Sequence, residues 1–141
     1  MLNKTATRLP EGLFLRFNVS AVQQWHVEKI GHPVDPFDVV NGGGLRHHGV
    51  DAGVFATLAP PSAALFVDAP DAPLVAVGVP TIFPVPNGDG ALPDPHEGIS
   101  FLLYDNLWST NYPFWYPFAV GDEMLTWRFS LVVFTPPSES R

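Results

Sequence analysis

The chain has 141 residues, 46% of them hydrophobic and 15% charged, a balance typical of a globular domain and not of a disordered chain. A net charge of −7, with only 7 basic residues, argues against nucleic acid and anionic membrane surfaces as partners. The absence of cysteine excludes disulfides and thiolate metal sites, while 16 prolines and 12 glycines favour short strands over long helices.

The first half of the chain alternates short apolar runs with turn signals. In residues 13–17, LFLRF, the side chains at 13, 15 and 17 are expected on one face of a strand. Residues 20–31 fit a strand slightly better than a short helix. Further strands are expected at 45–50, 53–58 and 63–69, where glycine and proline bound each run.

The second half contains the longest predicted loop and the longest predicted strand. Residues 79–97 are rich in proline and glycine and predict a surface loop. The apolar run 99–106 predicts a strand covered on both faces, and 124–134 predicts a final strand before a frayed tail at 135–141. The pattern predicts an all-β fold, an antiparallel β-sandwich with few or no helices, as one domain or part of one over residues 1–141.

The sequence offers only weak candidates for catalytic and metal-binding residues. His47 and His48 are adjacent on a predicted strand and point to opposite faces, so they cannot share a metal ion and are expected to be polar edge residues. The carboxylate pairs Asp68/Asp71 and Asp122/Glu123 lie at predicted turns and are expected to be solvated. Motifs for a serine or cysteine nucleophile are absent. We therefore predict no catalytic residue, no metal ligand and no cofactor in this chain.

The sequence YDNLWSTNYPFWYPF, residues 104–118, is the most distinctive stretch. It holds seven aromatic residues, including all three tyrosines, among asparagines and hydroxyl groups. Aromatic faces beside amides are typical of sugar-binding surfaces. The same residues could instead fill a corner of a β-sandwich, with the asparagines at turns. Residue types alone favour core packing.

Four segments resemble the C-terminal β-sandwich region of glycoside hydrolase family 38-like proteins, the α-mannosidase-like enzymes. They are RLPEGLFLRF, WHVEKIGHPVDPFDVVNGGGLRHHGV, GISFLLYDNLWSTNYPFWYPF and LTWRFSL. The resemblance extends over residues 4–134. The family includes a branch whose C-terminal part is catalogued as a domain of unknown function. Its most specific element is an ordered set of side chains: Asn106, Trp108, Asn111, Trp115, Arg128 and Phe129.

The resemblance implies a longer parent protein. Family members carry an N-terminal barrel with a zinc ion, an aspartate nucleophile and an acid/base carboxylate, and they cleave α-mannosides with retention of configuration. None of those motifs can be placed on this chain, and His47 and His48 do not fall in the zinc motifs. The resemblance implies a non-catalytic C-terminal domain that supports a catalytic barrel of the same parent protein, with zinc in that barrel and α-mannoside glycans as its ligands.

The same resemblance assigns roles to the ordered set. Asn106 and Asn111 are expected to fix a turn, with Trp108, Phe114 and Trp115 packed beneath it against residues 125–129. If the domain reaches the rim of the active site, the substrate-binding candidates are Asn111, Trp115 and Arg128. Arg128 is alternatively expected to pair with Asp105 or Asp122.

Two other functions remain open from the sequence. One is a free-standing carbohydrate-binding module that uses residues 104–118. The other is a small enzyme, which would need two carboxylates in one cleft. Residues 1–12 carry no apolar run like that of a signal peptide, and no apolar span long enough for a membrane helix occurs, so the sequence predicts a soluble chain of unknown compartment.

Overall fold

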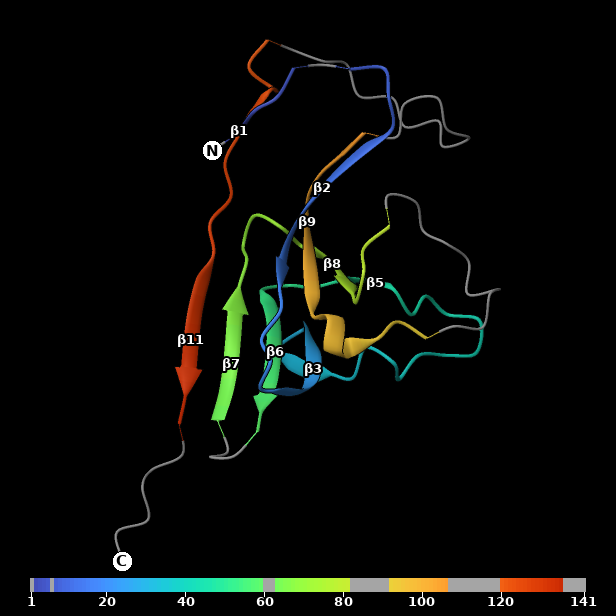
Figure 1. Cartoon of the computed structure of the whole chain (residues 1–141), viewed down its shortest axis with the longest axis vertical. Coiled ribbons are helices and arrows are strands. Elements are labelled where there is room, and N and C mark those ends of the chain that lie inside the picture. The colour runs from blue at the N-terminus through green and yellow to red at the C-terminus, as the bar shows by residue number, and fades with distance from the viewer. Residues whose placement is uncertain (1, 6, 60–62, 82–91, 107–119, 136–141) are drawn as a thin grey trace, which may run out of the picture.

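A computed structural model describes residues 2–5, 7–59, 63–81, 92–106 and 120–135 of the chain, which form an antiparallel β-sandwich (Figure 1). This confirms the predicted fold class. The elements are β1 (Leu2–Asn3), β2 (Glu11–Phe17), β3 (Val22–Lys29), β4 (His32–Val34), β5 (His47–Gly49), β6 (Gly53–Leu58), β7 (Ala63–Asp68), β8 (Leu74–Val77), the 3-10 turn η2 (Pro95–Glu97), β9 (Ile99–Asn106), β10 (Met124–Leu125) and β11 (Ser130–Phe134).

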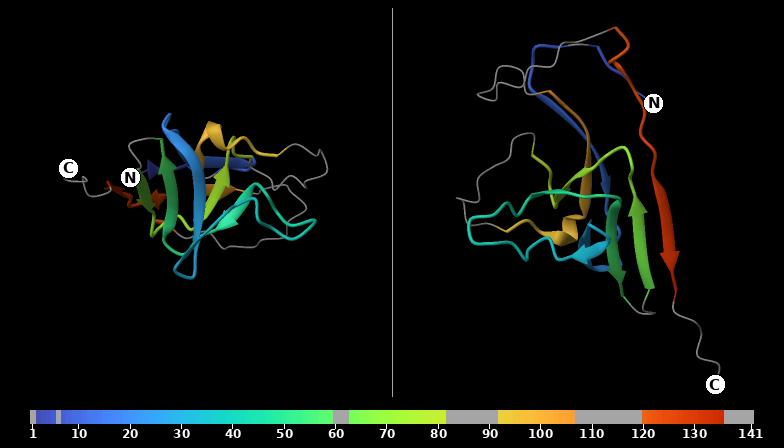
Figure 2. Two further views of the ribbon diagram at one scale, coloured as in Figure 1. Left: turned by 90° about the horizontal axis from the view of Figure 1, so that it is seen from below. Right: turned by 180° about the vertical axis from the view of Figure 1, so that it is seen from behind.

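Two sheets make up the sandwich. The five-stranded sheet has the order β11-β7-β6-β3-β4, and the four-stranded sheet has the order β2-β9-β8-β5. The short strands β1 and β10 form a separate two-stranded ribbon. Figure 2 shows that this ribbon lies at one end of the molecule, beyond the two sheets. All strand pairs are antiparallel, which suits a chain with short connections.

The core lies between the two sheets and is filled by apolar side chains from both. The buried residues are Trp25, Val27, Val54, Ala56, Leu65 and Val67 from the five-stranded sheet, with Val75, Ile99 and Phe101 from the four-stranded one. Phe101 meets Phe17 with 5.7 Å between ring centroids and Phe129 with 5.4 Å, both edge to face. These aromatic contacts join the N-terminal, central and C-terminal parts of the chain.

The inner strand β9 is buried on both faces only over Ile99–Phe101, whereas its apolar sequence predicted cover along the whole strand, and the residues from 102 to 106 are half-buried or exposed. Phe101 lies opposite Val75 on the core face, and Ser100 lies opposite Ala76 on the other face. Both Ser100 and Ala76 are also buried. By contrast, Leu13 and Leu15 of the edge strand β2 remain partly exposed although Phe17 packs against the core, and the β2–β9 register shifts between Leu13 and Phe14.

The long strand predicted at 124–134 is two strands, and this corrects the sequence prediction. β10 ends at Leu125 and β11 begins at Ser130. Trp127 and Phe129 of the connecting segment are half-buried against the core. In β11, Leu131 and Val133 lie opposite the core residues Val67 and Leu65, but their exposed fractions are 56% and 61%.

The turn between β3 and β4 forces an unfavourable backbone conformation on one residue. Lys29 lies opposite His32, so the turn consists of Ile30 and Gly31, whose φ angles are 52° and 77°. Positive φ at both central residues is typical of a type I′ turn, which favours Asn-Gly. A β-branched side chain is disfavoured there. Ile30 is 86% exposed, so little packing offsets the strain.

We therefore predict that Ile30→Asn stabilises the protein by about 1 kcal/mol, because asparagine tolerates the left-handed conformation. Urea unfolding followed by circular dichroism should show a higher midpoint with an unchanged slope. The control Ile30→Val keeps β-branching and should leave the midpoint unchanged. A lower midpoint for Ile30→Asn would contradict the proposed strain.

Candidate functional site

Asn106 ends β9 and holds the segment that leads into β2. Its side-chain Nδ2 donates to the carbonyl oxygens of Thr7 at 3.0 Å and Leu9 at 2.8 Å. Both bonds join parts of the chain that are remote in sequence. A side chain that donates twice to the backbone acts as a local clamp. Of the other residues expected at this corner, Trp108, Asn111, Phe114 and Trp115 lie outside the described part of the chain.

Arg128 forms a bidentate ion pair with Asp71, whereas Asp105 or Asp122 had been expected. Its Nε donates to Oδ2 of Asp71 at 2.8 Å, and one terminal nitrogen donates to Oδ1 at 2.7 Å. The backbone N–H of Arg128 also donates to Oδ2 at 2.9 Å. Asp71 was expected to be a solvated turn residue. It instead ties the turn after β7 to the segment that leads into β11.

Phe129, next to Arg128, contacts both the edge strand β2 and the inner strand β9 of the four-stranded sheet. Its ring centroid lies 5.8 Å from that of Phe17 on β2 and 5.4 Å from that of Phe101 on β9. The described candidates therefore lie apart from one another: Asn106 at one end of β9, Arg128 at the turn after β7, and Phe129 between the sheets. Within the described residues, they do not form one concave site.

His47 and His48 on β5 point to opposite faces, as predicted from their adjacency. His47 lies opposite Ala76, and His48 lies opposite Val75. His48 is almost completely buried, which corrects the expectation of polar edge residues. Although β5 is an edge strand, this side chain points into the interior, where its Nε2 lies 3.2 Å from the carbonyl oxygen of Leu45. Burial lowers the pKa of both His47 and His48 below the ordinary value of 6.5.

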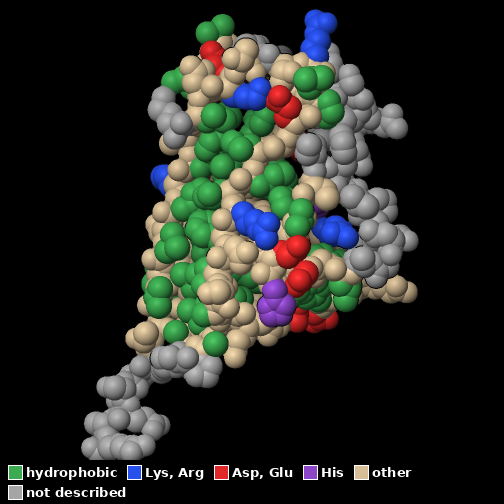
Figure 3. Space-filling view, viewed as in Figure 1, with side chains coloured by type: hydrophobic (Ala, Val, Ile, Leu, Met, Phe, Trp, Pro, Cys, Tyr) green, Lys and Arg blue, Asp and Glu red, His purple; other side chains and the backbone are tan. Residues whose placement is uncertain are grey.

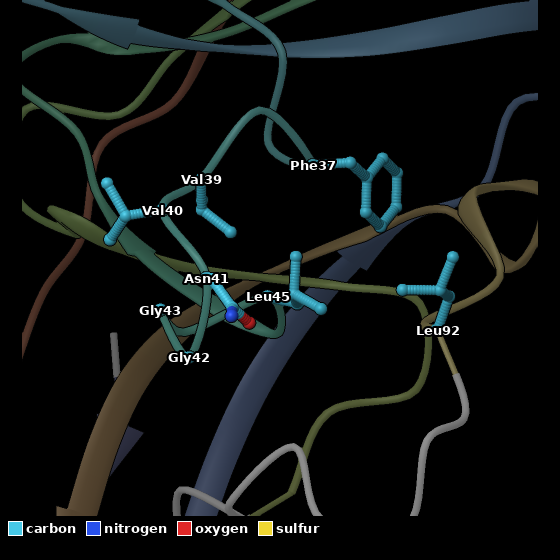
Figure 4. Close-up of a pocket in the computed structure, with 8 residues that line it drawn as sticks. All are labelled: Phe37, Val39, Val40, Asn41, Gly42, Gly43, Leu45 and Leu92. Carbon is cyan, nitrogen blue, oxygen red and sulfur yellow. The ribbon is translucent and has the colours of Figure 1, made fainter.

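Two hollows on the described surface are open; the first is lined about equally by polar and apolar groups, and the second is mainly apolar. The first, about 560 Å³, is formed by the loop between β4 and β5 together with Leu92 (Figure 4). Phe37, Val39 and Leu45 line it, and Asn41 supplies the polar side chain. The second, about 500 Å³, lies beside Thr57 and Phe134. Neither lining contains a carboxylate or a histidine, so neither has the groups for acid–base chemistry.

The carboxylate pairs named as catalytic candidates have structural contacts. Asp71 accepts from Arg128, as described above. Glu123 accepts from the backbone N–H of Gly121 at 2.9 Å and so closes the turn before β10. Among the residues that the structure describes, no three His, Asp or Glu side chains are grouped closely enough to hold a metal ion.

The most conspicuous surface feature is a set of exposed apolar side chains at two sheet edges, which we call the open side. It consists of Leu13 and Leu15 on β2 with Leu131 and Val133 on β11. β2 and β11 are each the outermost strand of their sheet, and the Phe17–Phe129 contact joins the end of β2 to the residue before β11. Figure 3 shows hydrophobic side chains in a nearly continuous band over the side that carries β11 and β7. A large exposed apolar patch is typical of an interaction surface.

Searches against family models, curated proteins and solved structures returned no match for the chain. The resemblance to α-mannosidase-like proteins consequently stays a prediction from the sequence. A separate search for membrane-crossing helices in the described residues found none of sufficient length and apolarity.

The buried histidines make stability depend on pH. A folded-state pKa below 6.5 means that the unfolded chain binds protons more readily, so the free energy of unfolding should fall as the pH drops below 6.5. We expect this loss in urea titrations between pH 7.5 and 5.5. Burial raises the pKa of Asp105, which acts in the opposite direction, so the comparison must be made between variants.

His48→Gln and His47→Gln should each reduce the dependence on pH, and the double variant should reduce it further, even though His48→Gln itself lowers stability. Asp105 interacts electrostatically with His47, so its contribution cancels only in the comparison of His48→Gln with the parent chain, which is therefore the decisive one. A His48→Gln variant whose stability falls with acidification as steeply as that of the parent chain would contradict the role of His48.

The ion pair gives a second prediction. The hydrogen bonds from Arg128 hold the pKa of Asp71 below its ordinary value of 3.8. In Arg128→Gln the pKa of Asp71 should rise toward 3.8, as measured by carboxyl ¹³C chemical shifts during an acid titration. Arg128→Lys, which keeps the charge without the planar fork, should give an intermediate value. An unchanged Asp71 pKa in Arg128→Gln would contradict the pairing.

Proposed function

We propose that this chain is a non-catalytic β-sandwich domain of an α-mannosidase-like glycoside hydrolase. In this role it packs against and supports a catalytic barrel of the same parent protein, and the barrel carries the zinc ion and the carboxylates that cleave α-mannosides. The chain itself binds no cofactor. The proposal combines the sequence resemblance with one structural observation, the open side.

The open side supports the proposal because it is the kind of surface that a larger assembly covers. Leu131 and Val133 project from the five-stranded sheet at a place where the four-stranded sheet does not cover them. A domain that worked alone would expose these side chains to water at a cost of about 25 cal/mol per Å² of apolar surface. A second polypeptide surface packed there would remove that cost.

The contacts of the candidate residues point the same way. Asn106 clamps backbone, Arg128 is held by Asp71, and Phe129 packs between the sheets. Each contact stabilises the sandwich, and those of Asn106 and Arg128 use polar groups that a substrate would need. The alternative function, a free-standing carbohydrate-binding module, depends on Asn111 and Trp115 of the 104–118 stretch, which lie outside the described residues.

Two measurements test this function. An antibody raised against residues 20–35 should detect, in extracts of the source organism, a polypeptide clearly larger than the recombinant 141-residue chain. The purified 141-residue chain should release no nitrophenol from 4-nitrophenyl α-D-mannoside above the buffer rate. A native product of the recombinant size would contradict the proposal. So would mannoside hydrolysis that a single Asp→Asn change in this chain abolishes.

A further inference from the structure

The outermost strands of the two sandwich sheets differ sharply in how they are protected from pairing with another chain. Natural sheets protect such edges with short strands, prolines, charges or register irregularities. β4 has three residues and contains Pro33, and β5 has three residues and ends in Gly49. β2 is longer, but it carries Glu11 and Arg16 and has the register shift against β9.

β11 has none of these protections. Its five residues, SLVVF, include no charge and no proline, and they pair with β7 without a register shift. Its inner face exposes Leu131 and Val133, while its outer face exposes Val132 and Phe134, with exposed fractions of 42% and 52%. Among the residues that the structure describes, no strand pairs with the outer edge of β11. This edge therefore offers backbone donors and acceptors between apolar side chains, which is the arrangement that strand addition requires.

We propose that β11 pairs antiparallel with β11 of a second copy of this chain, which joins two five-stranded sheets into one continuous sheet. This dimer goes beyond the proposed function and does not depend on it. The two copies would be related by a twofold axis perpendicular to the sheet, so the inner face of one copy continues into the inner face of the other. Residues that lie opposite each other across the two strands must therefore belong to the same face. Only registers in which one residue lies opposite its own copy meet this condition.

The register centred on Val132 uses the whole strand. It places Val132 opposite Val132, Leu131 opposite Val133, and Ser130 opposite Phe134 of the other copy. Each of these pairs is free of charge, so no like charges oppose each other across the ladder. The strand is thus complementary to itself, which favours a second copy over an unrelated strand as its occupant.

Size and charge set the strength of this pairing. Five residues make a ladder about 17 Å long, and an edge of that length buries well below the roughly 800 Å² per partner of a standard interface. Each copy also carries a net charge of −7, so the two copies repel each other outside the strand. The dimer should accordingly be weak, depend on concentration and strengthen with added salt.

Sedimentation equilibrium of the 141-residue chain tests the dimer. Between about 10 µM and about 1 mM the weight-average mass should rise from that of a monomer toward twice that value. Val132→Lys should weaken dimerisation at least about tenfold, because two ammonium groups would meet at the twofold axis. The matched control is Val120→Lys, which changes the net charge equally at a residue that is 96% exposed and lies before β10, outside β11. It should dimerise like the parent chain.

Two variants with opposite charges at residue 132 test the register and show whether a loss of dimer is caused by misfolding. Val132→Lys and Val132→Glu should each be monomeric and folded by circular dichroism, and their mixture should form a heterodimer in native mass spectrometry. A parent chain that stays monomeric to 1 mM overturns the proposal and leaves β11 free for a strand of a different polypeptide. Open-ended aggregates in place of a dimer, equal dimerisation of Val132→Lys and the parent chain, or a mixture without heterodimer also overturn it.

Discussion

The contact of Phe129 with Phe17 and Phe101 is the interaction on which the arrangement of the two sheets depends. Phe129 directly precedes β11, which belongs to the five-stranded sheet, whereas Phe17 and Phe101 belong to the four-stranded sheet. The three rings therefore fix the separation of the sheets at the side where both end. The same contact joins the residue before β11 to the end of β2. The open side exists because the packed rings stop at Phe129 and the strand continues beyond them.

An acidic chain usually suggests a surface that attracts cations, but here many carboxylates are acceptors for the protein's own backbone. The nearly buried Glu28 accepts from the N–H groups of Gly31 and Ala52 and so joins two loops. Asp35 accepts from Phe37, and Asp94 accepts from His96 at the start of η2. These bonds satisfy donors that strands leave unpaired at their ends. The negative charge is thus partly a consequence of how the irregular connections are held.

Much of the fold could be predicted from the sequence, because alternating apolar residues and glycine or proline turns mark the strands directly. The predictions failed where a property depends on what lies opposite in space. Alternation indicated which side of the last strand holds Leu131 and Val133, but it could not show that the opposing sheet ends before reaching them. β8 was missed because four apolar residues between Pro73 and Gly78 are too few to show a period. β4 was missed because a strand of three residues that contains Pro33 shows no apolar alternation.

The candidate site was less predictable than the fold for a related reason. The Arg128–Asp71 pair and the Asn106 clamp join segments remote in sequence, and nothing in the local pattern of either segment specifies its partner. Adjacency correctly placed His47 and His48 on opposite faces. It could not reveal that one of those faces is the core, because a short strand rich in histidine and glycine is typical of an exposed edge.

The pairing of β7 with β11 also constrains how the polypeptide can assemble during synthesis. β7 precedes β11 by several strands, so the strand that completes its sheet is the last of the described strands to leave the ribosome. Until then the outer edge of AALFVD stays unpaired beside the finished hairpin with β6. A translation product that stops before residue 130 keeps that edge permanently. Such a shortened product is expected to aggregate through this edge, so β11 protects the sheet only in chains that are translated beyond it.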